Sequence, residues 1–313
     1  MPGNRSVPLT GTGPDGQIAA KRGHAVSRYT SVRIGWLALL AVANAAPAAV
    51  VLSYDAAGPG GSDGCWHNAQ GQNRMNLRFD GNRKPTATAI HDPAAPGLRA
   101  AMTFDGFGAT CDSLERFDRG MVRRDVSFEM WVRPDRLNGR QMLFETGGNV
   151  YGTALFLDGS DLVYIAQTGN AHQSVTTRAA LSAEATERFL HVVAVTDFQN
   201  DSPGPVDIDL YVDGSLVGTN RYEGDFRRWA GRNGMGLGTK NRGMPGHDRQ
   251  CGDLYGQIAS FAVHDLGLSA GQVAGLYART AASPAEAVPE PATLVLLGLG
   301  GALAAGRRRG YAS

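Results

Sequence analysis

The sequence predicts an all-β protein, a two-sheet antiparallel jelly-roll sandwich, and three observations carry this prediction. Short runs of apolar residues alternate with polar ones, as in strands with one buried face. Turn signals separate these runs at intervals of about ten residues, a spacing typical of sandwiches and jelly rolls. Gly makes up 42 of the 313 residues and charged residues only 19%. Both values fit a loop-rich β protein.

The clearest predicted hairpin spans residues 207–219. Ile208, Leu210 and Val212 alternate with polar residues, so one face of the first strand is expected to be buried and the other exposed. Asp213-Gly214 then supplies two residues that tolerate the positive φ angles of a tight turn. The acidic residues of the exposed face either keep it soluble or bind a cation, and solubility is the simpler interpretation.

Residues 49–280 form the expected globular domain. Besides the hairpin, strands are expected at 50–55, 75–79, 102–105, 126–133, 142–145, 154–158, 162–166, 172–177, 189–197, 234–239 and 255–263. The strand at 126–133 has large side chains on both faces, which predicts that both faces are covered. One helix is expected after Ser269, a natural N-cap, with Val273, Leu276 and Tyr277 on one face.

The N-terminal residues 1–48 are expected to be a disordered extension followed by a signal peptide. Arg22, Arg28 and Arg33 precede a short apolar run, and the small residues that follow at 43–48 offer two cleavage patterns. The apolar run is too short for an ordinary membrane span. Either translation starts downstream of Met1, or the extension is part of the protein.

The C-terminal residues combine three parts in a fixed order after a linker at 281–287. These parts are the motif Val288, Pro289, Glu290 and Pro291, an apolar run at 292–306, and the cluster Arg307, Arg308 and Arg309. About fifteen residues of helix cover ~22 Å, so this transmembrane helix is short for a ~30 Å hydrocarbon core. Snorkelling or bilayer thinning can compensate. The arginines are expected on the cytoplasmic side.

Residues 288–309 resemble a PEP-CTERM sorting signal. The resemblance implies an exported protein whose tail an exosortase-type membrane peptidase recognises and removes. It also implies display at the cell surface or in the extracellular matrix, with anchoring by the C-terminal helix before processing. An ordinary tail anchor that follows Pro-Glu-Pro is the alternative.

The globular domain resembles the LamG-like jelly-roll domain of the concanavalin A-like lectin/glucanase superfamily. The residues that carry the resemblance are the runs at 102–106, 126–134, 191–195, 210–214, 256–261 and 268–270. Members of this family bind sugars or proteins outside the cell, sometimes through Ca²⁺. The fold by itself does not fix the ligand.

No enzyme activity is expected. Glycoside hydrolysis needs two carboxylates that flank the scissile bond, and glucanases of this fold carry them on one strand as Glu-x-Asp-x-x-Glu. Glu129 stands alone on its strand, and Asp207, Asp209 and Asp213 have a different spacing. The G-x-S-x-G match around Ser269 has no His after it, so a nucleophile elbow is excluded.

A calcium site is the one cofactor that the sequence suggests. Asp197, Asn200 and Asp201 cluster between two strands, and Asp105 lies in another turn. Ca²⁺ prefers such oxygen ligands, although each of these residues is also ordinary in a turn.

The three cysteines, Cys65, Cys111 and Cys251, lack the Cys-x-x-Cys spacing of zinc or redox sites. In an exported protein one disulfide is expected, with one cysteine left as a thiol. Cys65–Cys251 and Cys111–Cys251 both remain open as the pair.

The expected function is non-catalytic recognition of an extracellular polysaccharide or of another surface protein. A structural matrix protein without a ligand site, or a glycan hydrolase, are the alternatives. A net charge of +1 and the lack of a basic stripe argue against a nucleic-acid partner. Trp66, Tyr151, Tyr222 and Trp229 lie in predicted loops, where they either stack on sugars or cover the edge of the sandwich.

Overall fold

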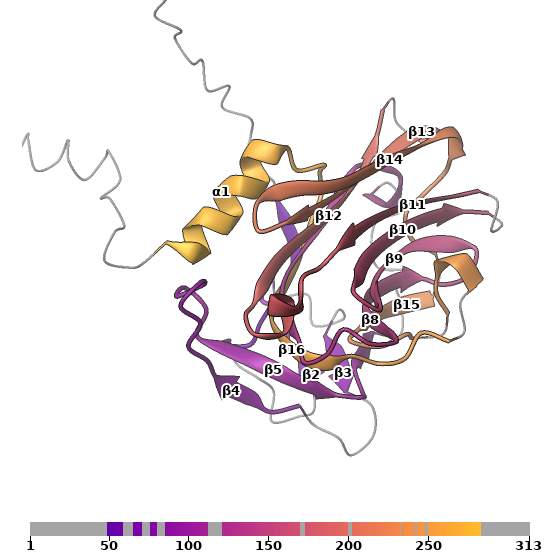
Figure 1. The fold of residues 1–313 in the computed structure, drawn as a ribbon. Coiled ribbons are helices and arrows are strands. Elements are labelled where there is room, and N and C mark those ends of the chain that lie inside the picture. The colour runs from indigo at the N-terminus through magenta and orange to yellow at the C-terminus, as the bar shows by residue number, and fades with distance from the viewer. Residues whose placement is uncertain are drawn as a thin grey trace, which may run out of the picture. The chain divides into compact units, whose positions relative to one another are not determined.

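The computed structural model describes residues 49–58, 65–70, 76–79, 85–111, 121–169, 173–199, 202–231, 233–241, 243–247 and 250–282. It confirms the all-β prediction, because two antiparallel sheets pack face to face and helix α1 (Ala270–Ala281) lies outside them (Figure 1). The predicted signal peptide, transmembrane helix and sorting motif lie outside these described residues. Within the described residues, no helix is long and apolar enough to cross a membrane.

Sheet A is eight-stranded, and β7 (Val126–Pro134) lies near its middle. The strand order is β14 (Ser215–Phe226), β13 (Gly204–Val212), β12 (Leu190–Phe198), β7, β16 (Tyr255–His264), β5 (Ala100–Asp105) and β4 (Ala87–Ala89), while β1 (Val50–Asp55) also pairs with β16.

Sheet B is also eight-stranded and antiparallel. Its order is β11 (Ser174–Ala180), β10 (Asp161–Thr168), β9 (Tyr151–Asp158), β8 (Arg140–Gly147), β15 (Asn233–Leu237), β6 (Ala109–Cys111), β3 (Leu77–Phe79) and β2 (Cys65–Trp66). In the described connections lie the short 3₁₀ helices η2 (Met121–Arg123), η3 (Ala183–Thr186) and η4 (Pro245–His247).

The core lies between the two sheets and is rich in aromatic rings. The centroids of Phe128 and Phe144 are 4.6 Å apart, and Trp229 meets Phe128 edge to face at 5.5 Å. Trp66 and Trp229 are 1% and 0% exposed, so these two predicted loop aromatics are core residues and are not available to stack on a sugar. Tyr151 and Tyr222 are half-buried.

The predicted hairpin is confirmed as β13 and β14, with φ angles of 51° at Asp213 and 78° at Gly214. The predicted helix is confirmed as α1. Ser269 caps it by accepting a hydrogen bond from the backbone N–H of Gln272. The buried Val273 faces an apolar cluster on the outer face of sheet A that includes Val193.

The outer face of β7 is covered at Trp131, whose ring stacks on Tyr277 of α1 with centroids 5.9 Å apart.

Candidate functional site

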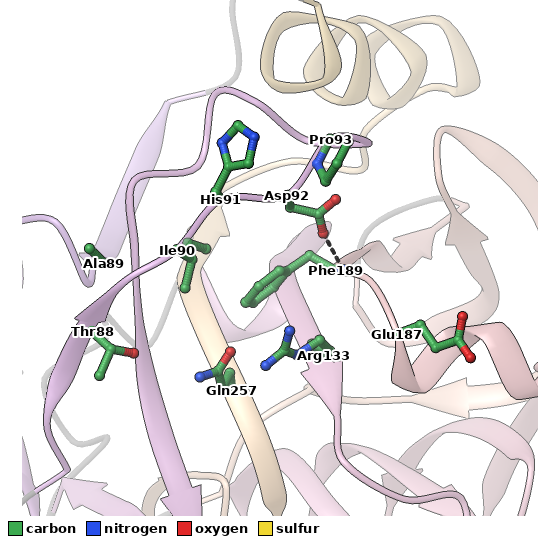
Figure 2. A pocket seen from close by; sticks show the side chains of 10 residues that line it. All are labelled: Thr88, Ala89, Ile90, His91, Asp92, Pro93, Arg133, Glu187, Phe189 and Gln257. Carbon is green, nitrogen blue, oxygen red and sulfur yellow. Dashed lines mark hydrogen bonds between the residues drawn. The ribbon is translucent and has the colours of Figure 1, made fainter.

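A polar pocket of about 270 Å³ opens on the outer face of sheet A, beside α1 (Figure 2). Its volume suits a small ligand or one unit of a polymer. Side chains from β4 and the segment after it, from β7 and β16, and from the segment before β12 line it: Thr88, Ala89, Ile90, His91, Asp92, Pro93, Arg133, Glu187, Phe189 and Gln257.

The floor of the pocket is formed by Arg133 of β7 and Gln257 of β16, which pair directly across the two strands. Both side chains point outward, because the neighbouring Val132 and Ile258 face the core. The Arg133 guanidinium carbon lies 5.4 Å from the centroid of the buried Phe189 ring. Packing of this kind holds the guanidinium in place.

Two buried polar atoms of this floor have no hydrogen-bond partner among the described residues. They are Nε of Arg133, which is a donor, and Oε1 of Gln257, which is an acceptor. The Gln257 amide is oriented by its nitrogen, which donates to Oγ1 of Thr103 at 3.2 Å. A buried polar atom without a partner is costly, so a ligand that offers one acceptor and one donor here relieves that cost.

Asp92 forms one wall and is fully committed to the protein. Its Oδ1 accepts from the Ala94 N–H at 2.8 Å and its Oδ2 from the Phe189 N–H at 2.6 Å. The same loop is tied to the last turn of α1, since the Gly97 N–H donates to the Thr280 carbonyl at 3.0 Å. Asp92 therefore shapes the pocket.

The rim of the pocket is open and carries the exposed His91 and Glu187. Glu187 and Asp92 are the two carboxylates that line the pocket. Both Asp92 oxygens already accept from backbone N–H groups, so Glu187 is the one carboxylate of this pair that is not committed to the protein. Hydrolysis by two carboxylates needs both members.

Glu129, which stands alone in the sequence, is held between two histidines. Its Oε1 lies 3.0 Å from Nε2 of His191, and its Oε2 lies 2.8 Å from Nε2 of His264. Burial works to raise the pKa of Glu129, but the two hydrogen bonds outweigh it and lower the pKa to about 2. Glu129 therefore faces imidazoles on both sides, and its role here is to join β7, β12 and β16.

Glu145 of β8 is a further buried acid that the sequence did not single out. Burial raises its pKa to about 8, although its carboxylate accepts from the Asn241 N–H at 2.8 Å. The side chain is 0% exposed, so it fastens the loop around Asn241 to sheet B.

Asp105 and Asp197, two of the predicted calcium ligands, lie toward opposite ends of β16. Asp105 pairs with Tyr255 at the start of β16. Asp197 lies beside the start of β7, and this part of β7 pairs with the other end of β16. Asn200 and Asp201 lie outside the described residues. Within the described part of the chain no three acidic, His or Cys side chains gather to hold a metal. A calcium site at Asp197, Asn200 and Asp201 stays a prediction.

No disulfide is drawn between Cys65, Cys111 and Cys251 in the structure, and the expected pair stays a prediction. Cys111 lies in the core between the sheets, while Cys251 packs with Met142 in a separate apolar cluster on the outer face of sheet B. Burial raises the pKa of the Cys251 thiol to about 12, which disfavours the reactive thiolate.

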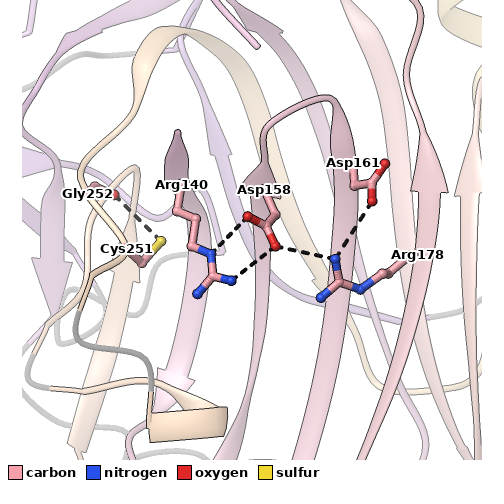
Figure 3. A network of polar contacts seen from close by, with 6 residues as sticks. All are labelled: Arg140, Asp158, Asp161, Arg178, Cys251 and Gly252. Atoms are coloured by element: carbon pink, nitrogen blue, oxygen red, sulfur yellow. Dashed lines mark hydrogen bonds and ion pairs between the residues drawn. The ribbon is translucent and has the colours of Figure 1, made fainter. Parts of the chain in front are cut away.

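A ladder of alternating charges crosses sheet B near Cys251 (Figure 3). Arg140 Nε lies 2.9 Å from Asp158, and Arg178 lies 3.3 Å from Asp158 and 3.7 Å from Asp161. The hydrogen bond from Arg140 lowers the pKa of Asp158. These charges neutralise one another, so the ladder is a solvated surface network.

The sandwich with a polar pocket on its outer face is a lectin-like jelly-roll domain. A family model described as the concanavalin A-like lectin/glucanases superfamily matches residues 113–274, slightly more than half of the chain. The chain belongs to this superfamily, which confirms the resemblance seen in the sequence.

Solved structures share the fold. The binding domain of botulinum neurotoxin serotype C1 has a TM-score of 0.50 and 11% identity, over 74% of this chain and 52% of that chain. The binding domain of botulinum neurotoxin DC in complex with SialylT has a TM-score of 0.50 and 12% identity, over 74% and 51%. The chain thus spans about half the length of these domains. No curated protein sequence matches it.

The PEP-CTERM protein-sorting motif matches residues 287–309 and confirms the predicted sorting signal. The motif marks an exported surface protein that is anchored in the membrane until an exosortase processes it. The last described residue is Ala282, the C-cap of α1. The match to the sorting motif begins five residues after it.

The sequence did not single out the pocket residues Arg133, Gln257, Asp92 and Phe189. The only local signal for these pocket residues was a long polar side chain at an outward position of an otherwise apolar strand. The pairing of β7 with β16, which places Arg133 beside Gln257, joins strands more than a hundred residues apart.

Proposed function

We propose that this surface protein binds an extracellular polysaccharide without cleaving it, through the pocket on sheet A. The observation that carries the proposal is the pair of buried, unpartnered polar atoms on the pocket floor, one a donor and one an acceptor. A sugar hydroxyl both donates and accepts. Two adjacent hydroxyls of a sugar ring therefore complement Arg133 and Gln257 together.

The superfamily supports a carbohydrate ligand, although hydrolases also belong to it. Non-catalytic binding is supported by the committed Asp92 oxygens and by Glu129, which is enclosed by His191 and His264. Release of reducing ends from the polysaccharide by the purified domain would contradict this part of the proposal.

The binding test compares the wild-type protein with Arg133→Ala, using exopolysaccharide fragments from the native host. Hydrogen bonds to a charged group contribute roughly 1.5–3 kcal/mol when buried, so Kd is expected to rise at least tenfold. Arg279→Ala, which removes an exposed arginine from α1, serves as the matched control. Measurements with Ca²⁺ and with EDTA show whether the predicted calcium site contributes.

Equal affinities of Arg133→Ala and the wild type would contradict binding at this pocket. A lack of binding by the wild-type protein to any fragment would favour the structural matrix protein instead. Thermal unfolding of each variant confirms that a loss of affinity does not come from a loss of folding.

Surface display rests on processing of the tail. The mature protein in the native host is expected to end near Pro289–Pro291, and intact-mass spectrometry of protein released from the cell surface measures this end. A double variant, Pro289→Ala with Pro291→Ala, is expected to keep its tail. Mature wild-type protein that extends through Arg309 would contradict exosortase processing.

A further inference from the structure

Two pairs of arginines, far apart in the sequence, meet at one end of the sandwich. The buried Trp229 joins them: its backbone N–H donates to the Val122 carbonyl at 2.9 Å, and its indole N–H donates to the Met121 carbonyl, 108 residues away, at 3.2 Å. Arg123 and Arg124 directly follow Met121 and Val122 in the chain. Arg227 and Arg228 directly precede Trp229. We call these four residues the arginine rim.

The backbone of the arginine rim is fixed by the core. The Arg227 N–H donates to Oγ1 of the buried Thr168 at 3.1 Å, and the Ser202 hydroxyl donates to the Arg227 carbonyl. The Arg228 guanidinium carbon lies 4.0 Å from the centroid of the Tyr151 ring. A surface held in this way loses little conformational entropy when it binds.

The charges of the arginine rim are available to a ligand. Arg123, Arg124 and Arg227 are exposed, and Arg228 is half-buried. Four other arginines of the described residues pair with carboxylates, namely Arg140, Arg178, Arg188 and Arg221. No ion pair joins the arginine rim to a carboxylate of the described residues.

Among the described residues, two carboxylates neighbour the arginine rim in the sequence. Asp125 follows Arg124 and is engaged, since its Oδ1 accepts from the Phe198 N–H at 2.8 Å. Asp225 is exposed two residues before Arg227. With four arginines against these two acids and the nearby Asp197, the described part of the rim keeps a positive charge that the net charge of +1 for the whole chain conceals.

We propose that the arginine rim binds the carboxylates of an acidic polysaccharide. A guanidinium offers a planar fork of donors that matches a carboxylate in two parallel hydrogen bonds. A polymer with regularly spaced carboxylates contacts several arginines at once, which adds avidity. The inference rests on the proposed function in one respect, because surface display is what brings the rim to an extracellular polysaccharide.

A nucleic acid fits the arginine rim less well. Single strands bind through stacking of bases on exposed aromatic faces as well as through charge. The aromatic ring that borders the described rim is that of Tyr151, and Arg228 covers one of its faces.

The arginine rim and the pocket are separate sites. Arg124 lies just before the start of β7 and Arg133 near its end. Nine residues at ~3.3 Å each place them roughly 30 Å apart along the strand. A variant in one site is therefore expected to leave the other intact.

The test measures the binding of oligogalacturonate to the full-length protein and to a triple variant, Arg123→Ala, Arg124→Ala and Arg227→Ala. These exposed side chains are chosen because their loss spares the packing of Arg228 on Tyr151. Kd is expected to rise about tenfold in the triple variant. Added salt is expected to weaken wild-type binding more than binding of the variant.

Two controls separate the possible causes. Methyl-esterified oligogalacturonate has the same backbone without the charge and is expected to bind no more tightly to the wild type than to the triple variant. A second triple variant, Arg78→Ala, Arg99→Ala and Arg279→Ala, removes three exposed arginines elsewhere and is expected to keep wild-type affinity.

Three outcomes would overturn the proposal. One is equal affinity of the wild type and the rim variant for oligogalacturonate. Another is equal affinity of the wild type for the free and the esterified oligomer. The third is much tighter binding of duplex DNA than of the acidic oligomer at the same salt, which would assign the rim to nucleic acid. The binding of host fragments by Arg133→Ala tests the pocket, and its outcome does not decide whether the arginine rim binds acidic polysaccharide.

Discussion

At the scale of single residues, Glu129 shows how an isolated acid in the sequence becomes a junction in the fold. His191 and His264 are 62 and 135 residues away from it along the chain. Tyr277 of α1 lies over His191, with ring centroids 5.9 Å apart. The carboxylate thus joins three strands of sheet A beneath the helix.

Replacing Glu129 with Gln is expected to destabilise the protein by about 3 kcal/mol at pH 7. The amide keeps one acceptor but turns a donor toward a histidine. The pKa of Glu129 is lowered to about 2 in the folded state, so its stabilisation is complete above the unfolded pKa of about 4.5 and is lost as the pH falls toward 2.

Denaturant unfolding at pH 7 and at pH 3 measures this difference. The difference in the free energy of unfolding between wild type and Glu129→Gln is expected to be smaller at pH 3 than at pH 7. Glu187→Gln, a change at an exposed carboxylate, is the matched control and is expected to stay within about 0.5 kcal/mol of wild type. A gap for Glu129→Gln that is the same at both pH values would contradict the assigned role.

At the scale of elements, the β13–β14 hairpin connects a local turn to the packing of α1. Gly214 has a φ of 78°, and a Cβ there would lie 3.3 Å from the Ala274 Cα and from the Tyr277 ring. Asp213, the other turn residue, accepts from the His191 N–H at 3.0 Å. The turn therefore holds both the start of β12 and the helix.

Gly214→Ala is expected to destabilise the fold by about 1–2 kcal/mol, because Ala is strained at positive φ and crowds α1. Gly275→Ala in α1 is the matched control, since a Cβ there meets nothing within 4 Å. This control is expected to stabilise the protein by up to about 1 kcal/mol. Thermal unfolding midpoints measure both, and a Gly214→Ala midpoint at or above wild type would contradict the role of the turn.

The longer elements could be predicted from the sequence, because alternation over many residues is a local property. β7, β13 and α1 lie close to the expected bounds. The short strands β2, β4 and β6 were not expected. Each has two or three residues, too few to show a period, and pairing with neighbours alone makes them strands.

The pocket and the arginine rim could not be predicted, because both arise from pairing between distant segments. The register of β7 and β16 places Arg133 opposite Gln257. The hydrogen bond from Trp229 to Val122 brings the segment of Arg124 next to the segment of Arg227. Trp229 stands among polar residues in a loop-like stretch, so its burial was not visible in the sequence.

At the scale of the whole molecule, the pocket lies at the end of the domain from which the chain continues toward the sorting motif. The loop that carries Asp92 is bonded to Thr280 in the last turn of α1. The arginine rim lies at the other end of sheet A. Among the described residues, the pocket is therefore the site nearer to the end of α1.

The central claim, that the pocket binds a sugar, is tested most directly by the NMR signal of the Arg133 Nε–H group. Titration with host exopolysaccharide fragments is expected to shift this signal and slow its exchange with water, because the sugar supplies the acceptor that the group lacks. The Arg279 signal serves as the internal control and is expected to stay in place. A saturating titration that leaves Arg133 unchanged would contradict the claim.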